Sequence, residues 1–528
     1  LPGTVWLFRK HLRDSELLGA ALLLALNPLL LYYSRFMRSD LLVATFMFVA
    51  LGLAVRFYDT RKPRYLYGVV AFIVLGFSSK ENAVVYLLTW VGAAALLTDH
   101  ALFRPRSGDS GFALLAGKVR VIRDRGLGES SRVLLRYVGH WVGATILGFV
   151  LLLFMYAPRG DVSEIIPTAV PGTASYVGFW EGITNPAKWG QLVDTSLNGF
   201  SVEMTARSYP HTFDGIIGGL EYWFTTEGPQ CSSQSVAGID VTGILGAVGI
   251  QVESISGYPC TLGQFLDVLV TVALPFIALA VVGTILERYG RPISRNLVMF
   301  TAYIGFVSLI GYPLGTDIFG AWILVHVLVP LSIPAGVMLA KVYRWGTEAF
   351  ADEDAVSLAI STLLIVLLVG QMVFVSAGAV YTNNTSGDNV MVQYAQASND
   401  LREPLEEMNR IARDHDGEPD MIIYGSTLTD FRPAVLDNQP HCAAWYNPML
   451  PLPWYLYKAD VTTDCVNGTA NLTERLERNP PPIVLTTGGD NTVPVSRLDA
   501  SYEPMSGEIR TGARERVFWI HEDWLSTE

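Results

Sequence analysis

Nine apolar stretches constrain the fold of this chain more than any other feature of its sequence. They lie at 15–33, 40–56, 65–79, 82–98, 137–156, 264–286, 296–313, 318–340 and 356–380. A helix needs about 20 apolar residues to span a bilayer, and a spanning helix satisfies its own backbone hydrogen bonds. Half of the 528 residues are apolar and only 16% are charged, unlike in a single water-soluble globule. The sequence therefore predicts a polytopic α-helical membrane domain over residues 1–380.

Basic residues fall in every second loop between these stretches. Arg and Lys concentrate in the segments 8–14, 56–64, 104–136, 287–295 and 341–344. Such loops normally face the cytoplasm. The loops 35–40 and 78–82, the long loop 157–263 and the tail after 380 are then extracytoplasmic. We expect a multi-pass protein of the cell membrane.

Two further features agree with this orientation. The four cysteines all lie on the predicted outer side, and their positions suggest the disulfides Cys231–Cys260 and Cys442–Cys465 in an oxidising compartment. The N-x-S/T sequons all lie in the tail, at Asn383, Asn384, Asn467 and Asn471. We interpret 157–263 as an extracellular insertion in the membrane domain.

The tail, residues 381–528, is predicted to be a separate extracellular α/β domain. A helical pattern in 390–415 precedes the strand-like "MIIY" at 421–424, and "NLTERLERNPPPIVLTT" at 471–487 repeats the order of helix and strand. The segment "RVFWIHED" indicates a further strand. Helices that alternate with short apolar strands are typical of a small α/β domain.

The charge balance limits the partners of the chain. A net charge of −12 leaves no basic face for phosphate backbones, so we expect no nucleic-acid partner. Only 7 Lys accompany 30 Arg and 49 acidic residues. This balance resembles that of proteins from halophilic archaea, although GC-rich codon usage would also explain it.

Charged residues gather at two short loop tips on the predicted outer face. "RFMRSD" supplies Arg35, Arg38 and Asp40, and "SSKEN" supplies Lys80 and Glu81. These residues can be interfacial anchors, because long basic side chains snorkel at helix ends. Basic residues are nevertheless unusual on this face. Guanidinium and ammonium groups bind phosphate oxygens, so we expect Arg35, Arg38 and Lys80 to hold an anionic lipid headgroup.

His326 is the next candidate residue. It lies about eight residues into the apolar stretch that begins at 318, or about 12 Å deep at 1.5 Å per residue. An ionisable residue at that depth faces the bundle interior or a wet cavity. It can be a buried imidazole bonded to a neighbouring helix, a headgroup contact, or a divalent-metal ligand together with Glu81.

A family resemblance emerges at these same residues. The segments "NPLLLYYSRFMRSD" (27–40) and "GFSSKENAVVYLL" (76–88) resemble GT-C membrane glycosyltransferases, including the protein O-mannosyltransferase and aminoarabinose transferase relatives. With "AWILVHVLVPLSIPAG" (321–336) and "LPLPWYLYKAD" (450–460), the chain looks more like the archaeal flippase-activity-associated family of N-glycosylation. The resemblance covers most of the membrane part and touches the tail.

The resemblance implies transfer of a sugar from a polyprenyl (dolichyl) phosphate donor to a glycan or protein acceptor at the outer face. In such enzymes an acidic residue of the first external loop is the general base, and cations at helix tips hold the phosphate. Arg35, Arg38, Lys80 and His326 would bind the lipid phosphate. The presumed base lies upstream of residue 1, which leaves Asp40 and Glu81 as weak candidates for it.

Two other functions stay open. The protein can be a non-catalytic accessory that binds the lipid-linked glycan and assists its flipping, or a scaffold whose tail binds surface proteins. A carrier built from inverted repeats should show related halves around midplane charges. The charged residues cluster at one face instead, which favours the enzyme or the accessory protein.

Overall fold

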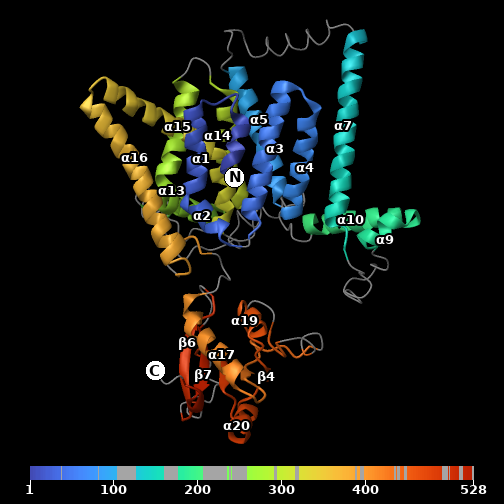
Figure 1. Cartoon of the computed structure of the whole chain (residues 1–528), viewed down its shortest axis with the longest axis vertical. Coiled ribbons are helices and arrows are strands. Elements are labelled where there is room, and N and C mark those ends of the chain that lie inside the picture. The colour runs from blue at the N-terminus through green and yellow to red at the C-terminus, as the bar shows by residue number, and fades with distance from the viewer. Residues whose placement is uncertain are drawn as a thin grey trace, which may run out of the picture. The chain divides into compact units, whose positions relative to one another are not determined.

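A computed structural model of the chain describes two compact units, Leu1–Val380 and Tyr381–Glu528 (Figure 1). Their placement relative to each other is not determined, so each is described by itself. The structure describes residues 1–36, 38–80, 82–103, 127–159, 177–205, 235–236, 239–240, 258–290, 294–314, 320–386, 389–392, 398–432, 436, 440–444, 449–489, 498, 500–510 and 515–525.

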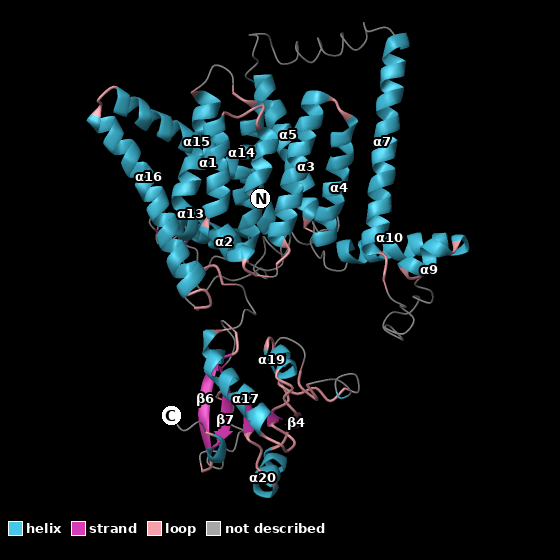
Figure 2. Ribbon diagram, viewed as in Figure 1, coloured by secondary structure: helices cyan, strands magenta, loops and turns pink. Residues whose placement is uncertain are grey.

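The first unit is a helical bundle (Figures 1 and 2). After a 3₁₀ helix at Pro2–Phe8, its helices are α1 (Asp14–Leu26), α2 (Pro28–Ser34), α3 (Asp40–Thr60), α4 (Pro63–Ser79), α5 (Ala83–Phe103), α7 (Leu127–Tyr156), α9 (Phe179–Thr184), α10 (Trp189–Thr205), α13 (Tyr258–Tyr289), α14 (Asn296–Leu314), α15 (Val325–Ala351) and α16 (Ala355–Val375). Short 3₁₀ helices at Pro186–Lys188 and Ala321–Leu324 precede α10 and α15, and Ser376–Thr382 continues α16.

Each of the nine apolar stretches falls on a helix or a bent helix pair. Among the described residues, five helices are long and apolar enough to cross a membrane, and α1 with α2 makes a sixth candidate span, bent by 53°. Asn27 causes that bend, because it ends α1 and caps α2, and Pro28 follows it. The shorter helices Pro63–Ser79, Ala83–Thr98 and Asn296–Tyr312 are also apolar.

Helix α15 forms the core of the bundle. Of its most apolar window, with the preceding 3₁₀ turn, 89% is buried against other parts of the protein, compared with 17% for α16. Glycines bring α1 close to α15: a Cβ on Gly336 would lie 2.5 Å from the backbone nitrogen of Ala20. Small residues are the usual means of close helix packing in membranes. This packing fixes α15 as the central helix of the unit.

Helices α9 and α10 belong to the long loop 157–263. They lie crosswise to α7, as Figure 1 shows, and α10 contacts α7. The described parts of this loop are residues 157–159, 177–205 and 258–263 and the short strands β1 (Ser235–Val236) and β2 (Ile239–Asp240). The predicted pair Cys231–Cys260 cannot be followed, because Cys231 and the side chain of Cys260 lie outside the described residues.

The second unit is a mixed five-stranded sheet between helices. Its strands run in the order β4 (Thr463–Val466), β3 (Met421–Tyr424), β5 (Ile483–Thr487), β7 (Glu515–His521) and β6 (Tyr502–Glu508). Strands β4, β3 and β5 are parallel to one another. Strand β7 is antiparallel to both of its neighbours, β5 and β6. Successive side chains of β3 point to opposite faces of the sheet, and each face has its own hydrophobic core. Helices α17 (Arg402–Asp414) and α19 (Leu452–Lys458) cover one face, and α20 (Thr469–Arg478) covers the other.

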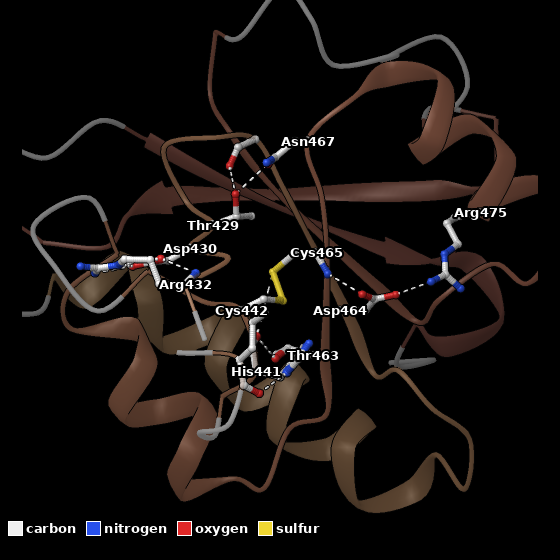
Figure 3. The surroundings of a disulfide bond; sticks show 12 residues. Thr429, Asp430, Arg432, His441, Cys442, Thr463, Asp464, Cys465, Asn467 and Arg475 are labelled. Carbon is white, nitrogen blue, oxygen red and sulfur yellow. Dashed lines mark hydrogen bonds and ion pairs between the residues drawn. A yellow bond between two sulfur atoms is a disulfide. The ribbon is translucent and has the colours of Figure 1, made fainter. Parts of the chain in front are cut away.

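A disulfide ties the edge strand of this sheet to a neighbouring loop. Cys442 and Cys465 are bonded, with their Cα atoms 6.1 Å apart (Figure 3). Cys465 lies on β4, and the adjacent Thr463 hydroxyl donates to the carbonyl of His441. Of the sequon residues, Asn467 and Asn471 are exposed at the start of α20.

The other two sequon residues lie near the start of the second unit. Asn383 is exposed and Asn384 is half-buried. The oligosaccharide attachment expected at all four positions stays a prediction.

Candidate functional site

Asp40 is the centre of a charged cluster at one end of the first unit. Its carboxylate accepts hydrogen bonds from Arg38 Nε at 3.1 Å and from Lys80 Nζ at 2.8 Å. His326 Nε2 lies 3.4 Å from the same carboxylate. The side chain of Asp40 is wholly buried, so these groups provide the partners that a carboxylate needs away from water.

The local sequence places these groups together. Asp40 is the first residue of α3, where the helix dipole favours a negative charge. Lys80 directly follows the last residue of α4 in extended backbone. The two helices are consecutive and pack closely along their lengths, so the start of α3 and the end of α4 meet at the same end of the bundle.

The two cations differ from Asp40 in their access to solvent. The side chains of Lys80 and Arg38 are 20% and 24% exposed, whereas that of Asp40 is 0% exposed. The guanidinium of Arg38 also lies 3.8 Å above the ring of Trp322, in cation–π geometry. The buried carboxylate and the ring therefore hold two positive groups that remain partly open to a ligand.

His326 is surrounded by polar and aromatic side chains. The hydroxyl of Tyr86 is 2.7 Å from Nδ1, and the amide of Asn82 is 3.3 Å from Nε2. Tyr312 stacks on the imidazole, with ring centroids 4.8 Å apart. A neutral ring can accept from Tyr86 at Nδ1 and donate from Nε2–H to Asp40, and Nε2 then accepts no bond from the amide nitrogen of Asn82.

The described residues do not test the possible divalent metal ion. Both ring nitrogens of His326 have protein partners. Among the described residues, no three His, Cys, Asp or Glu side chains come together as ligands would. Glu81, the other expected ligand, lies outside the described residues. We therefore assign the possible divalent metal no part in the reaction.

The structure brings together Arg38, Asp40, Lys80 and His326. Arg35 is directed elsewhere, since its guanidinium donates to the backbone carbonyl of Val380. His326 is the second residue of α15 and follows a 3₁₀ turn. It was expected about eight residues into an apolar helix, and it is the sixth residue of the candidate span Ala321–Ala351, whose first turn is 3₁₀.

Sequence reasoning missed four neighbours of the cluster, namely Asn82, Tyr86, Tyr312 and Trp322. Two buried polar atoms in this group, Asn82 Oδ1 and the Tyr312 hydroxyl oxygen, have no hydrogen-bond partner within the described residues. Buried polar atoms without partners are uncommon in native proteins and often mark a place for water or a ligand. Asn82 within "SSKEN" was the one visible signal, because it follows the charged tip directly.

Comparison with known proteins connects this geometry to two families. Residues 4–116, which include Arg38, Asp40 and Lys80, match the family described as dolichyl-phosphate-mannose-protein mannosyltransferase. Residues 401–521 match the Agl23 flippase-associated protein C-terminal domain. No curated protein matches the chain. The chain is similar to the crystal structure of ArnT from Cupriavidus metallidurans in the apo state, with 11% identity, a TM-score of 0.39, and coverage of 99% of this chain and 82% of that chain.

These findings describe a polytopic helical protein with several candidate membrane spans, in which residues 4–116 match a mannosyltransferase family. The chain also carries a flippase-associated domain built on a mixed sheet. The resemblance and the fold class expected from the sequence are both confirmed. The coarse role is that of a membrane glycosyltransferase-like protein.

Proposed function

We propose that this protein transfers a sugar from a polyprenyl-phosphate donor to a glycan or protein acceptor at the extracytoplasmic face of the membrane. The observation that carries the proposal is the buried Asp40 carboxylate, which holds Arg38 and Lys80 together at the end of the bundle. Two partly exposed cations held this way suit a phosphate, because ammonium and guanidinium groups form strong bonds to its oxygens.

In the proposed reaction, the bond between the sugar C1 and the phosphate oxygen breaks while the acceptor oxygen bonds to C1. Negative charge grows on the leaving phosphate, and Arg38 and Lys80 stabilise it. Asp40 acts as a positioning residue, since its carboxylate is buried and bonded to both cations. The acceptor hydroxyl releases its proton to solvent as its oxygen bonds to C1, and none of these residues is assigned as the base. Asn82 and Tyr312 offer the sugar two further polar atoms.

The extracytoplasmic location rests on chemistry rather than on geometry. A disulfide at Cys442–Cys465 is typical of an oxidising compartment. The sequons at Asn467 and Asn471 are exposed and would be accessible to an external oligosaccharyltransferase. These two features support our proposal that the second unit lies outside the cell. The lysine-poor, acidic composition supports a protein of halophilic archaeal type, and the match to a flippase-associated domain supports a role in N-glycosylation.

Substitution of the cations tests the proposal. We expect Lys80→Ala and Arg38→Ala each to lower transfer from a dolichyl-phosphate-hexose by about a hundredfold or more, as loss of one charge-stabilising donor does in other enzymes. Lys62→Ala is a matched control, because Lys62 is exposed at the opposite end of the same helix. The assay follows the radiolabelled hexose into acceptor with the purified full chain. Equal activity of Lys80→Ala and Lys62→Ala would contradict the proposal.

The match to a flippase-associated domain favours a second candidate function. In it the same cluster binds the lipid-linked sugar without forming a bond, and the protein assists flipping of that lipid. The test measures binding and consumption of the donor in the presence of acceptor. If the protein binds the donor, loses that binding in Lys80→Ala and never consumes the donor, the accessory function is favoured over transfer.

A further inference from the structure

A second charged pocket lies at the opposite end of the bundle from the Asp40 cluster. Its cavity of about 390 Å³ lies between the C-terminal half of α15, the end of α13 and the start of α1, and its polar lining includes Arg13, Glu287, Lys341, Arg344, Trp345 and Glu348. We call it the inner pocket. Lys341 is 15 residues beyond His326 on α15, or about 22 Å along the helix at 1.5 Å per residue.

Buried carboxylates beside this pocket already have partners. Glu16 and Glu287 are 0% and 2% exposed. Arg295 donates to Glu16 at 2.7 Å and binds Glu287 through both Nε and Nη2, at 3.1 and 2.9 Å. Arg344 adds an ion pair to Glu16 at 3.8 Å and donates to Ser15. These acids therefore do not compensate the remaining cations of the pocket.

Lys341 is the cation left for a ligand. It is exposed, and its side chain makes no hydrogen bond or ion pair with any described residue. Arg13, also exposed, lines the same pocket, and Glu348 is an exposed acidic residue of the lining besides the buried Glu287. Trp345 is 38% exposed beside them, and tryptophan is enriched at the level of lipid headgroups.

An apolar cavity lies next to the inner pocket. It holds about 370 Å³ between α1, α15 and α16, and its lining includes Leu22, Leu339, Leu368 and Met372. Ser15 lines this cavity and accepts a hydrogen bond of 2.7 Å from Arg344, which lines the inner pocket. This bond joins the lining of the polar space to the lining of a space that suits a hydrocarbon chain, which favours a lipid over a soluble anion.

We propose that the inner pocket binds the phosphate headgroup of an anionic lipid from the leaflet at this end of the bundle, with Lys341 and Arg13 as the charged contacts. Basic pockets between helices at the cytoplasmic side are known to bind anionic headgroups. This site is independent of the proposed sugar transfer, because it shares no residue with the Asp40 cluster. An annular lipid bound here would secure the packing of α1, α13 and α15.

The test uses the purified full chain in mixed micelles that contain phosphatidylglycerol or phosphatidylcholine, with bound lipid counted by native mass spectrometry. We expect phosphatidylglycerol to bind in preference. Lys341→Ala and Arg13→Ala should each weaken its binding about fivefold, the equivalent of about 1 kcal/mol for one basic residue near a membrane surface. Brominated phosphatidylglycerol should quench tryptophan fluorescence less in Trp345→Phe than in the parent protein.

Lys10→Ala is the matched control, because Lys10 is an exposed lysine near the start of α1 that does not line the pocket. It should leave phosphatidylglycerol binding unchanged. An equal loss in Lys10→Ala and Lys341→Ala, or no preference over phosphatidylcholine, would overturn the pocket as a specific site. If inorganic phosphate displaces the lipid, and does so only when Lys341 is present, the ligand of the pocket is a free phosphate and not a lipid headgroup.

Discussion

Replacement of Asp40 by asparagine removes the charge that holds the candidate site together. In the folded protein this carboxylate binds Lys80 at 2.8 Å and Arg38 at 3.1 Å, and its side chain is 0% exposed. Removal of one partner from a buried ion pair costs about 3–5 kcal/mol. The cations keep 20% and 24% exposure, so water offsets part of the loss. We therefore expect Asp40→Asn to lower the free energy of unfolding by about 3 kcal/mol, at the low end of that range.

The measurement is detergent-induced unfolding of the purified full chain, followed by circular dichroism. Asp59→Asn is the matched control: Asp59 lies near the other end of the same helix, and among the described residues its side chain bonds to His11 alone, at 2.9 Å. Loss of one such hydrogen bond should cost about 1 kcal/mol. The same preparations are assayed for sugar transfer, which Asp40→Asn should lower. A variant as stable and as active as Asp59→Asn would refute the view that Asp40 holds the two cations.

Two other perturbations test the packing of each unit. Gly336→Ala should destabilise the first unit by about 1–3 kcal/mol, because its Cβ would meet the backbone of Ala20 at 2.5 Å; Gly370→Ala, with nothing within 4 Å of its Cβ, should not, and detergent unfolding compares them. The double variant Cys442→Ser, Cys465→Ser should lower the stability of the second unit by about 3 kcal/mol, since the bond closes a loop of 23 residues. Pulse proteolysis measures this loss, and equal protection with and without the disulfide would contradict it.

Local sequence patterns predicted the elements and much of the charged site. Hydropathy located the spans, because a bilayer demands long apolar runs whatever their partners are. The tips that carry Arg38, Asp40 and Lys80 were recognisable because charges are costly between apolar helices. That Asp40 binds the other two required the contact between α3 and α4, which hydropathy alone does not specify.

Long-range pairings were beyond sequence reasoning. Tyr86 and Tyr312 lie in apolar helices, where an aromatic residue looks like ordinary core, yet both contact His326. Glu16 and Arg295 are 279 positions apart and bond directly. Contacts of this kind have no characteristic spacing in the sequence. They can be recognised only once the packing of helices that are distant in the chain is known.

The hydrogen bond from Arg35 to Val380 has a mechanical consequence. Val380 is the last residue of the first unit, so the chain leaves the bundle at this carbonyl. Arg35 lies three residues before Arg38, in the segment that leads to Asp40. Tension on the departing chain would therefore reach the segment that carries Arg38 and Asp40. A hydrogen bond thus connects the point where the polypeptide leaves the bundle to the loop that carries the charged cluster.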